Sequence, residues 1–129
     1  MALAWVHPDQ ATPESGEWRA RLLEGADLLV PSVWFLEVSN ALLVLERRRK
    51  LNRTERKRAL NLLMALPAEV DNAPPARALS ELATLAQEEG LSVYDAAYLD
   101  VAIRNGLPLA CRDQPLRAAA VKRGVTVSL

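Results

Sequence analysis

The alternation of helical segments with short apolar strands most constrains how this chain can fold. Four of its five glycines follow segments of helical pattern, as expected where a helix ends. The expected strands are residues 27–31, 68–73, 107–111 and 125–129. The expected helices are residues 2–6, 12–24, 33–50, 54–66, 75–89, 92–105 and 114–123. Such alternation predicts an α/β fold in which helices flank a parallel sheet.

Length and composition favour a single globular domain over residues 1–129, with half of the residues hydrophobic. One Cys and one His exclude a disulfide within the chain and a Cys/His zinc site. Cys111 suits a reducing cytosol, and the first residues lack the pattern of a signal peptide. The longest apolar stretch, residues 33–45, is short and interrupted by polar residues including Glu37. We therefore expect a cytoplasmic protein without a membrane span.

Three carboxylates are candidates for chemistry, and each has a structural alternative. Glu37 lies in an apolar helical segment after a strand, where it is either a solvated rim residue or directed into a polar pocket. Asp95 follows Ser92 at capping-box spacing. Asp113 follows the strand at 107–111 and is placed to cap the next helix. Asp100 lies about 140° around the helix from Asp95, so we expect it to be solvated or supporting.

Glu37 and Asp113 each follow the carboxyl end of a strand, where ligands bind in open parallel sheets. Carboxylates that meet there without His or Cys suit Mg²⁺ or Mn²⁺, and the usual substrate of such a site is a phosphate ester. Eight of the sixteen basic residues lie within residues 47–58, which are either a contact for a nucleic-acid backbone or a solvated surface. No glycine-rich phosphate loop or G-x-S-x-G motif occurs, and His7 is expected to be a surface residue.

The order and spacing of four motifs resemble the PIN-domain family, and within it the VapC-type toxin ribonucleases. The motifs are A-L-A-W-V-H-P-D at 2–9, P-S-V-W-F-L-E-V-S-N-A-L at 31–42, L-S-V-Y-D-A-A-Y-L-D-V-A at 91–102 and L-P-L-A-C-R-D-Q-P-L at 107–116. The resemblance implies a three-layer fold and an Mg²⁺-dependent RNA endonuclease with Glu37, Asp95 and Asp113 as metal-binding, catalytic carboxylates. It also implies a homodimer that a small antitoxin protein neutralises.

The chain departs from the family pattern in two places. Cys111 stands where the family usually has a hydroxyl residue. The family's first strand, which is central in its sheet, and the catalytic Asp at its end have no counterpart, because Met1 stands where a Val precedes the A-L-A-W segment. We therefore predict that the natural gene encodes about half a dozen or more further residues, including that strand and Asp. Cleavage by the 129-residue chain should be weak or absent.

Two other functions remain open at this point. A PIN-like binding module would keep the antitoxin or dimer surfaces without cutting RNA. A receiver-like signalling domain would hold Mg²⁺ near a phosphoryl group, but it requires paired acids after the first strand and a late Lys, neither of which is visible. Trp5, Trp18 and Trp34 in short amphipathic segments motivate a two-fold dimer; the alternative is that all three belong to the core.

Overall fold

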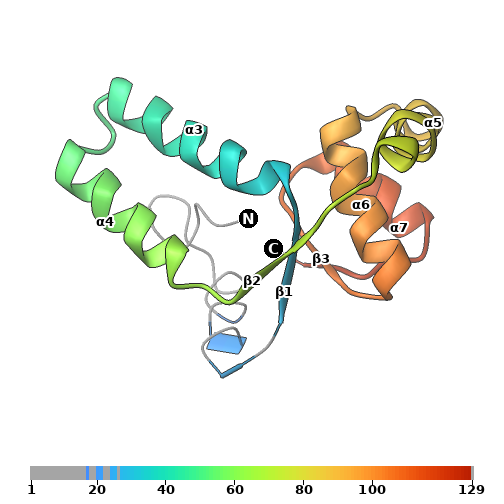
Figure 1. Ribbon diagram of the computed structural model, residues 1–129, viewed down its shortest axis with the longest axis horizontal. Coiled ribbons are helices and arrows are strands. Elements are labelled where there is room, and N and C mark those ends of the chain that lie inside the picture. Colours follow the sequence, from blue (N-terminus) through green and yellow to red (C-terminus); the bar gives the residue numbers. More distant parts are fainter. Residues whose placement is uncertain (1–16, 18–19, 22–23, 26, 129) are drawn as a thin grey trace. The chain divides into compact units, whose positions relative to one another are not determined.

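The computed structural model describes residues 17, 20–21, 24–25 and 27–128, and Figure 1 shows the order of their elements. They are β1 (Leu28–Pro31), α3 (Val33–Arg47), α4 (Arg53–Met64), β2 (Ala68–Asp71), the π-helix η2 (Arg77–Glu81), α5 (Leu82–Glu89), α6 (Val93–Asn105), β3 (Leu109–Ala110), α7 (Gln114–Lys122) and β4 (Val127–Ser128). The described residues form two compact units. The first unit contains the described residues up to Leu28 and residues 33–69. The second unit contains Leu29–Ser32 and the chain from Val70 onward.

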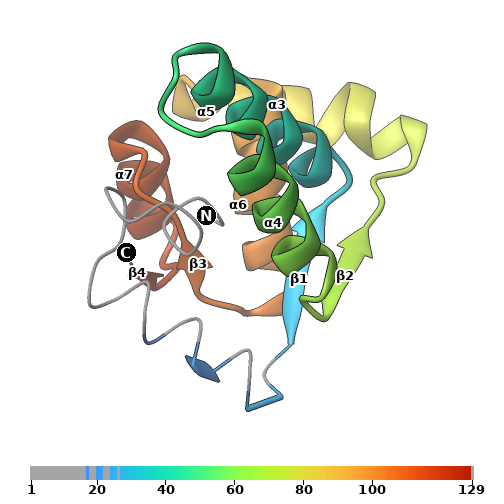
Figure 2. The same ribbon diagram turned by 90° about the vertical axis from the view of Figure 1, so that its left-hand side faces the viewer.

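The first unit is built on the hairpin of α3 and α4, which lie side by side in Figures 1 and 2. The buried residues of α3 are Trp34, Val38 and Leu42, spaced four apart and therefore on one face of the helix. Helix α4 begins with a full capping box, in which Asn52 and Glu55 each bond the backbone N–H of the other. Packing of one apolar face and a satisfied helix start stabilise this hairpin.

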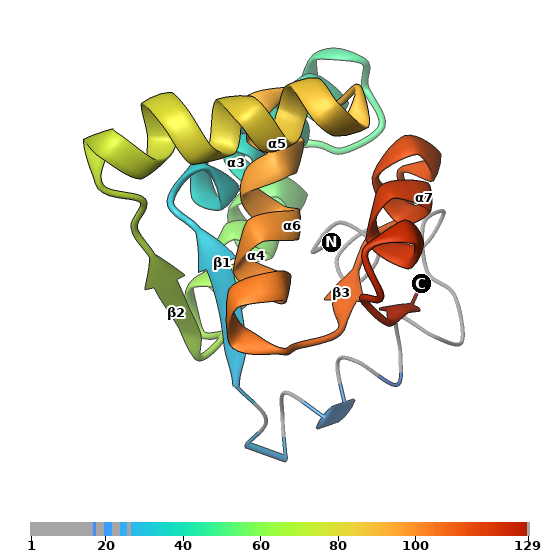
Figure 3. The same cartoon turned by 90° about the vertical axis from the view of Figure 1, so that its right-hand side faces the viewer.

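The second unit carries the paired strands β3 and β4 and the last three helices. Strands β3 and β4 are parallel, with Leu109 opposite Val127 and Ala110 opposite Ser128, while β1 pairs with β2 in a second sheet. Figure 3 shows α5 crossing α6, and α7 following β3. One buried core joins α6, β3 and α7; its members are Leu99, Ala102, Leu109, Cys111, Leu116, Ala119 and Ala120. The alanines let the two helices approach this short sheet closely.

The elements expected within residues 27–128 are present, so the mixed α/β architecture is confirmed. Three differ in extent. The helix expected to reach residue 50 ends at Arg47, the helical segment from Pro75 contains a π turn at Arg77–Glu81, and the strand at 107–111 is shorter. The helices expected at 2–6 and 12–24 and the expectation about Met1 fall wholly or largely outside the described residues. The single domain over 1–129 stays a prediction. Among the described residues no helix is long and apolar enough to cross a membrane.

Candidate active site

Asp113 stands at the carboxyl end of β3 and begins α7. Its Oδ2 accepts a hydrogen bond of 3.0 Å from the backbone N–H of Leu116, so the predicted N-cap is present. No other described residue donates to its carboxylate, and the side chain is exposed, so Oδ1 has no described donor. A carboxylate has about four lone-pair sites, so capping a helix and binding a cation are compatible.

Asp95 lies in the first turn of α6, where its backbone N–H donates to the hydroxyl of Ser92 at 3.0 Å. The predicted cap by Ser92 is therefore present, but the reciprocal bond of a capping box, from the Ser92 N–H to the Asp95 carboxylate, is not among the described contacts. The half-buried carboxylate receives no hydrogen bond from the described residues. It is thus available to a ligand beside the positive end of the helix dipole.

Cys111, directly after β3, carries a buried thiol. Burial raises the pKa of this thiol; the negative charges of Asp113 and Asp95 raise it further, whereas the charge of Arg117 lowers it. Asp113 follows β3, and Asp95 begins α6, which packs against both β3 and α7. Because its pKa is raised, Cys111 is a neutral thiol at pH 7 in the metal-free chain.

Arg117 holds the carboxyl ends of β3 and β4 together, and sequence reasoning missed this role. Its Nη1 donates to the backbone oxygens of Cys111 at 2.7 Å and Ser128 at 3.2 Å. The Arg117 N–H also closes the first turn of α7 on the Asp113 carbonyl at 2.9 Å. The position of Arg117 four residues after Asp113, on the same face of a helix that follows a strand, was the signal available in the sequence.

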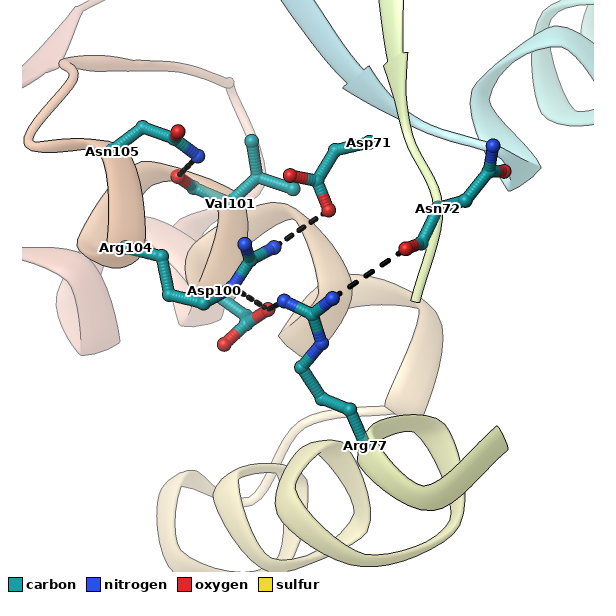
Figure 4. Close-up of polar contacts among 7 residues, drawn as sticks. All are labelled: Asp71, Asn72, Arg77, Asp100, Val101, Arg104 and Asn105. Carbon is teal, nitrogen blue, oxygen red and sulfur yellow. Dashed lines mark hydrogen bonds and ion pairs between the residues drawn. The ribbon is translucent and has the colours of Figure 1, made fainter. Parts of the chain in front are cut away.

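A cluster of two arginines and two aspartates anchors the carboxyl-terminal half of α6, as Figure 4 shows. Arg104 donates to Asp71 Oδ1 at 2.6 Å and to Asp100 Oδ2 at 2.8 Å, and Arg77 lies 4.0 Å from Asp100. The pKa of Arg104 is raised, chiefly by its hydrogen bond to Asp71. Asp100 is therefore a supporting residue, one of the two roles expected for it. The cluster ties α6 to the end of β2 and to η2, which fixes the helix that carries Asp95.

Glu37 lies in the first unit, on α3, with an exposed side chain. Of the three predicted site residues, the structure thus brings Asp95 and Asp113 to one region of the second unit. The convergence of Glu37 with them stays a prediction. Within the second unit, the described residues include no group of three or more His, Cys, Asp or Glu side chains arranged to hold a metal ion. Mg²⁺ is often held by only one or two carboxylates, together with water and substrate phosphates, so the pair is chemically suitable.

Comparisons with known proteins agree on the fold. The crystal structure of PAE2754 from Pyrobaculum aerophilum is similar to this chain, with a TM-score of 0.70 and 26% sequence identity; the match covers 88% of this chain and 74% of that one. No curated protein matches significantly. The model of the PIN domain family matches residues 2–122, which include Glu37, Asp95 and Asp113. The chain therefore belongs to the PIN domain family.

Proposed function

We propose that this chain is a divalent-metal-dependent RNA endonuclease of the VapC kind, the toxin of a toxin–antitoxin pair. Membership of the PIN domain family indicates a nuclease-type function, a nucleic-acid substrate and, in general, dependence on a divalent metal. RNA as the substrate, Mg²⁺ or Mn²⁺ as the metal, an antitoxin partner and a cytoplasmic location are our proposal. One observation carries it: Asp113 follows β3, Asp95 begins α6, which packs against β3 and α7, and each carboxylate keeps oxygens without a described donor.

The donor set fits a hard cation. Two carboxylates with available oxygens suit Mg²⁺ or Mn²⁺, whereas a softer metal prefers several thiolate or imidazole ligands, and Cys111 is the only Cys of the chain. Asp95 and Asp113 would hold the ion, and we propose Glu37 as the third carboxylate. A bound divalent ion would supply Lewis acidity that activates water and neutralises charge on the phosphodiester. Arg117 and the cluster around Arg104 would keep the two aspartates in place.

The second candidate function is a PIN-like module that binds an antitoxin, or a second copy of the chain, without cleaving RNA. The observation that favours it is apolar exposure beside Asp95. The side chains of Val93 and Tyr94, in the same turn of α6, are 42% and 64% exposed. Exposed aromatic side chains are common in protein interfaces. An antitoxin segment that covers this turn would also cover Asp95, so the surface is compatible with an inhibited nuclease as well.

Cleavage of total cellular RNA by the full chain separates the two functions. RNA is incubated with the protein in Mg²⁺ or in EDTA, and new 5′ ends are mapped by sequencing. We expect weak cleavage at discrete sites that require Mg²⁺ and that disappear in Asp95→Asn and Asp113→Asn. Asp27→Asn is the matched control, because Asp27 is exposed and follows no strand of the second unit. Mg²⁺-independent cleavage, or cleavage retained in both site variants, would refute the proposed enzyme. No cleavage by any variant would favour the binding module.

A further inference from the structure

Positive charge is concentrated where α3 leads into α4, on a surface that the proposed site does not use. We call it the basic corner and define it as Arg47, Arg48, Arg49, Lys50, Arg53, Arg56, Lys57 and Arg58. All of these side chains except Arg56 are exposed. The corner lies within the first unit, at the end of the hairpin where α3 leads into α4 (Figures 1 and 2). Eight cations at this end of the hairpin repel one another, which disfavours the fold unless anions offset their charge.

The acids of this segment are already engaged. Glu46 binds Arg56 Nε at 2.6 Å, and Glu55 accepts from the Asn52 N–H at 2.7 Å. Among the described residues, no ion pair involves any of the other seven cations of the basic corner. In the second unit, by contrast, Arg77, Arg104, Lys122 and Arg123 all pair with carboxylates. The neutral net charge of the chain thus conceals one surface whose charge is not compensated locally.

The backbone at this corner departs from the pattern of the other helix ends. Helices α5, α6 and α7 end with the same pair of backbone hydrogen bonds. The N–H of the left-handed residue donates to the carbonyl three residues earlier. The N–H of the next residue donates to the carbonyl five residues earlier. There the left-handed residue is a glycine and the next one is apolar; the pairs are Gly90 with Leu91, Gly106 with Leu107, and Gly124 with Val125.

Helix α3 ends with the same two hydrogen bonds but with two cations in these places. Arg49 donates to Glu46 O at 2.9 Å with φ at 58°, and Lys50 donates to Leu45 O at 2.8 Å. Arg49 is the only non-glycine residue with positive φ among the described residues. Positive φ is unfavourable for residues other than glycine, because Cβ then lies too close to the backbone carbonyl. The apolar residue is displaced by one place to the buried Leu51. Local stability favours glycine and an apolar residue here, so the two cations require another explanation.

We propose that the basic corner docks the phosphate backbone of RNA. This inference rests on the proposed function for the choice of RNA, but it concerns a surface of the other unit. Arg side chains match phosphate oxygens with two parallel donors, and binding gains from the release of counterions. A peptide interface would also need apolar contact at its centre. Leu51 is the only large apolar residue between Arg47 and Arg58, and it is buried, so a phosphate backbone fits this surface better than an acidic protein segment.

The decisive variant is Arg49→Gly in the full chain, because its two expected effects have opposite signs. Glycine relieves the positive φ, so the melting temperature should stay the same or rise. The affinity for RNA should fall, because one phosphate contact is lost. The probe is a fluorescein-labelled 20-nucleotide RNA hairpin, measured by fluorescence anisotropy in EDTA. A role only in the fold predicts the reverse, a lower melting temperature with unchanged affinity, and that result would overturn the proposal.

Salt dependence provides a second measurement that needs no cleavage. In the triple variant Arg48→Gln, Lys57→Gln, Arg58→Gln, the slope of log affinity against log KCl should fall by about 2 to 3, and affinity should drop about tenfold or more. Lys57→Gln should lower the slope by about 1, whereas the matched Lys122→Gln, whose side chain is 69% exposed in the second unit, should not. An unchanged slope in the triple variant would overturn the proposal, as would a poly-glutamate peptide that binds the corner while RNA affinity is unaffected.

These measurements can refute the docking surface without refuting the proposed enzyme, and the reverse also holds. Because they are made in EDTA, a lost catalytic activity does not affect them, and the control Asp27→Asn should bind the hairpin like the unaltered chain. Mg²⁺-dependent cleavage with unchanged binding in the corner variants would retain the enzyme and refute the docking surface. Salt-sensitive binding through the corner without cleavage by any variant would retain the docking surface and refute the enzyme.

Discussion

Asp113 gives one carboxylate oxygen to the N-cap of α7 and leaves the other for a ligand, so its two roles can be separated by substitution. Asn is as good an N-cap as Asp, and Asp113→Asn should therefore change the free energy of unfolding by less than about 0.5 kcal/mol. Asp113→Ala should lower it by about 1 kcal/mol. Both should reduce cleavage about 100-fold or more, since both remove the charge that holds the cation.

Urea unfolding and the rate of RNA cleavage, measured on the same preparations, check this prediction. If the urea midpoint of Asp113→Asn is lowered as much as that of Asp113→Ala, the N-cap bond does not account for the stability of this position. Asp113→Asn with full activity would remove Asp113 from the proposed site. The sequence was informative at this residue, because the strand before Asp113 and the helix after it are both evident in the pattern. It gave no indication that Arg117 would bridge to Ser128.

At the scale of elements, the ends of α5 and α7 are joined by ion pairs. Arg123 donates to Glu89 Oε1 and to Glu88 Oε2, each at 2.8 Å, and Lys122 lies 3.4 Å from Glu89. The side chain of Glu89 is 4% exposed. Its pKa is lowered from the usual 4.5, chiefly by the hydrogen bond from Arg123. These partners lie 33 to 35 residues apart in the sequence, so no local pattern predicts them.

The lowered pKa of Glu89 gives a prediction with a definite sign. A carboxylate whose pKa is lower in the folded state stabilises that state above its unfolded pKa of about 4.5, and this contribution is lost as the pH falls through the lower, folded value. Glu89→Gln should therefore melt at a lower temperature than the unaltered chain at pH 7. The difference should shrink below pH 4.5. Melting curves by circular dichroism from pH 3 to pH 7 test this, and a difference that grows toward acid would contradict it.

The helix ends show how far local patterns extend. Gly90 and Gly106 end α5 and α6 as the sequence predicts, because a left-handed residue favours glycine. The end of α3 was placed three residues too late, because the turn there uses Arg49 instead of glycine. The π turn that begins at Arg77 was also not predicted, since its widened hydrogen bond, from the Leu82 N–H to the Arg77 carbonyl, depends on packing in three dimensions.

For the whole molecule, the alternation of strands and helices was sufficient to predict the α/β class and, with the spacing of the acids, the PIN domain family. Two of the three predicted site residues lie in one unit because both border the elements around β3. The network of Arg77, Asp100, Arg104 and Asp71 was not predicted, because it joins side chains from η2, α6 and β2. Contacts of this kind follow from how elements pack, and a linear pattern does not specify that.

Self-association is a prediction at this scale. Trp34 is 4% exposed and belongs to the core, so it does not support a dimer; Trp5 and Trp18 lie outside the described residues. Exposed apolar side chains now support it better, for example Leu36 at 73% and Leu79 at 82%. Sedimentation velocity at micromolar concentration should give a dimer. A single monomer species across that range would contradict the two-fold assembly.

Metal binding by the full chain tests the central claim most directly. Mn²⁺ is titrated into the protein and followed by electron paramagnetic resonance, with the unaltered chain, Asp95→Asn, Asp113→Asn and the control Asp27→Asn compared at one ionic strength. We predict that the unaltered chain and Asp27→Asn bind Mn²⁺ with the same affinity. Each site variant should bind about tenfold or more weakly, because one of the proposed carboxylate ligands is removed. Equal binding by all four proteins, or by none, would contradict a metal site built on Asp95 and Asp113.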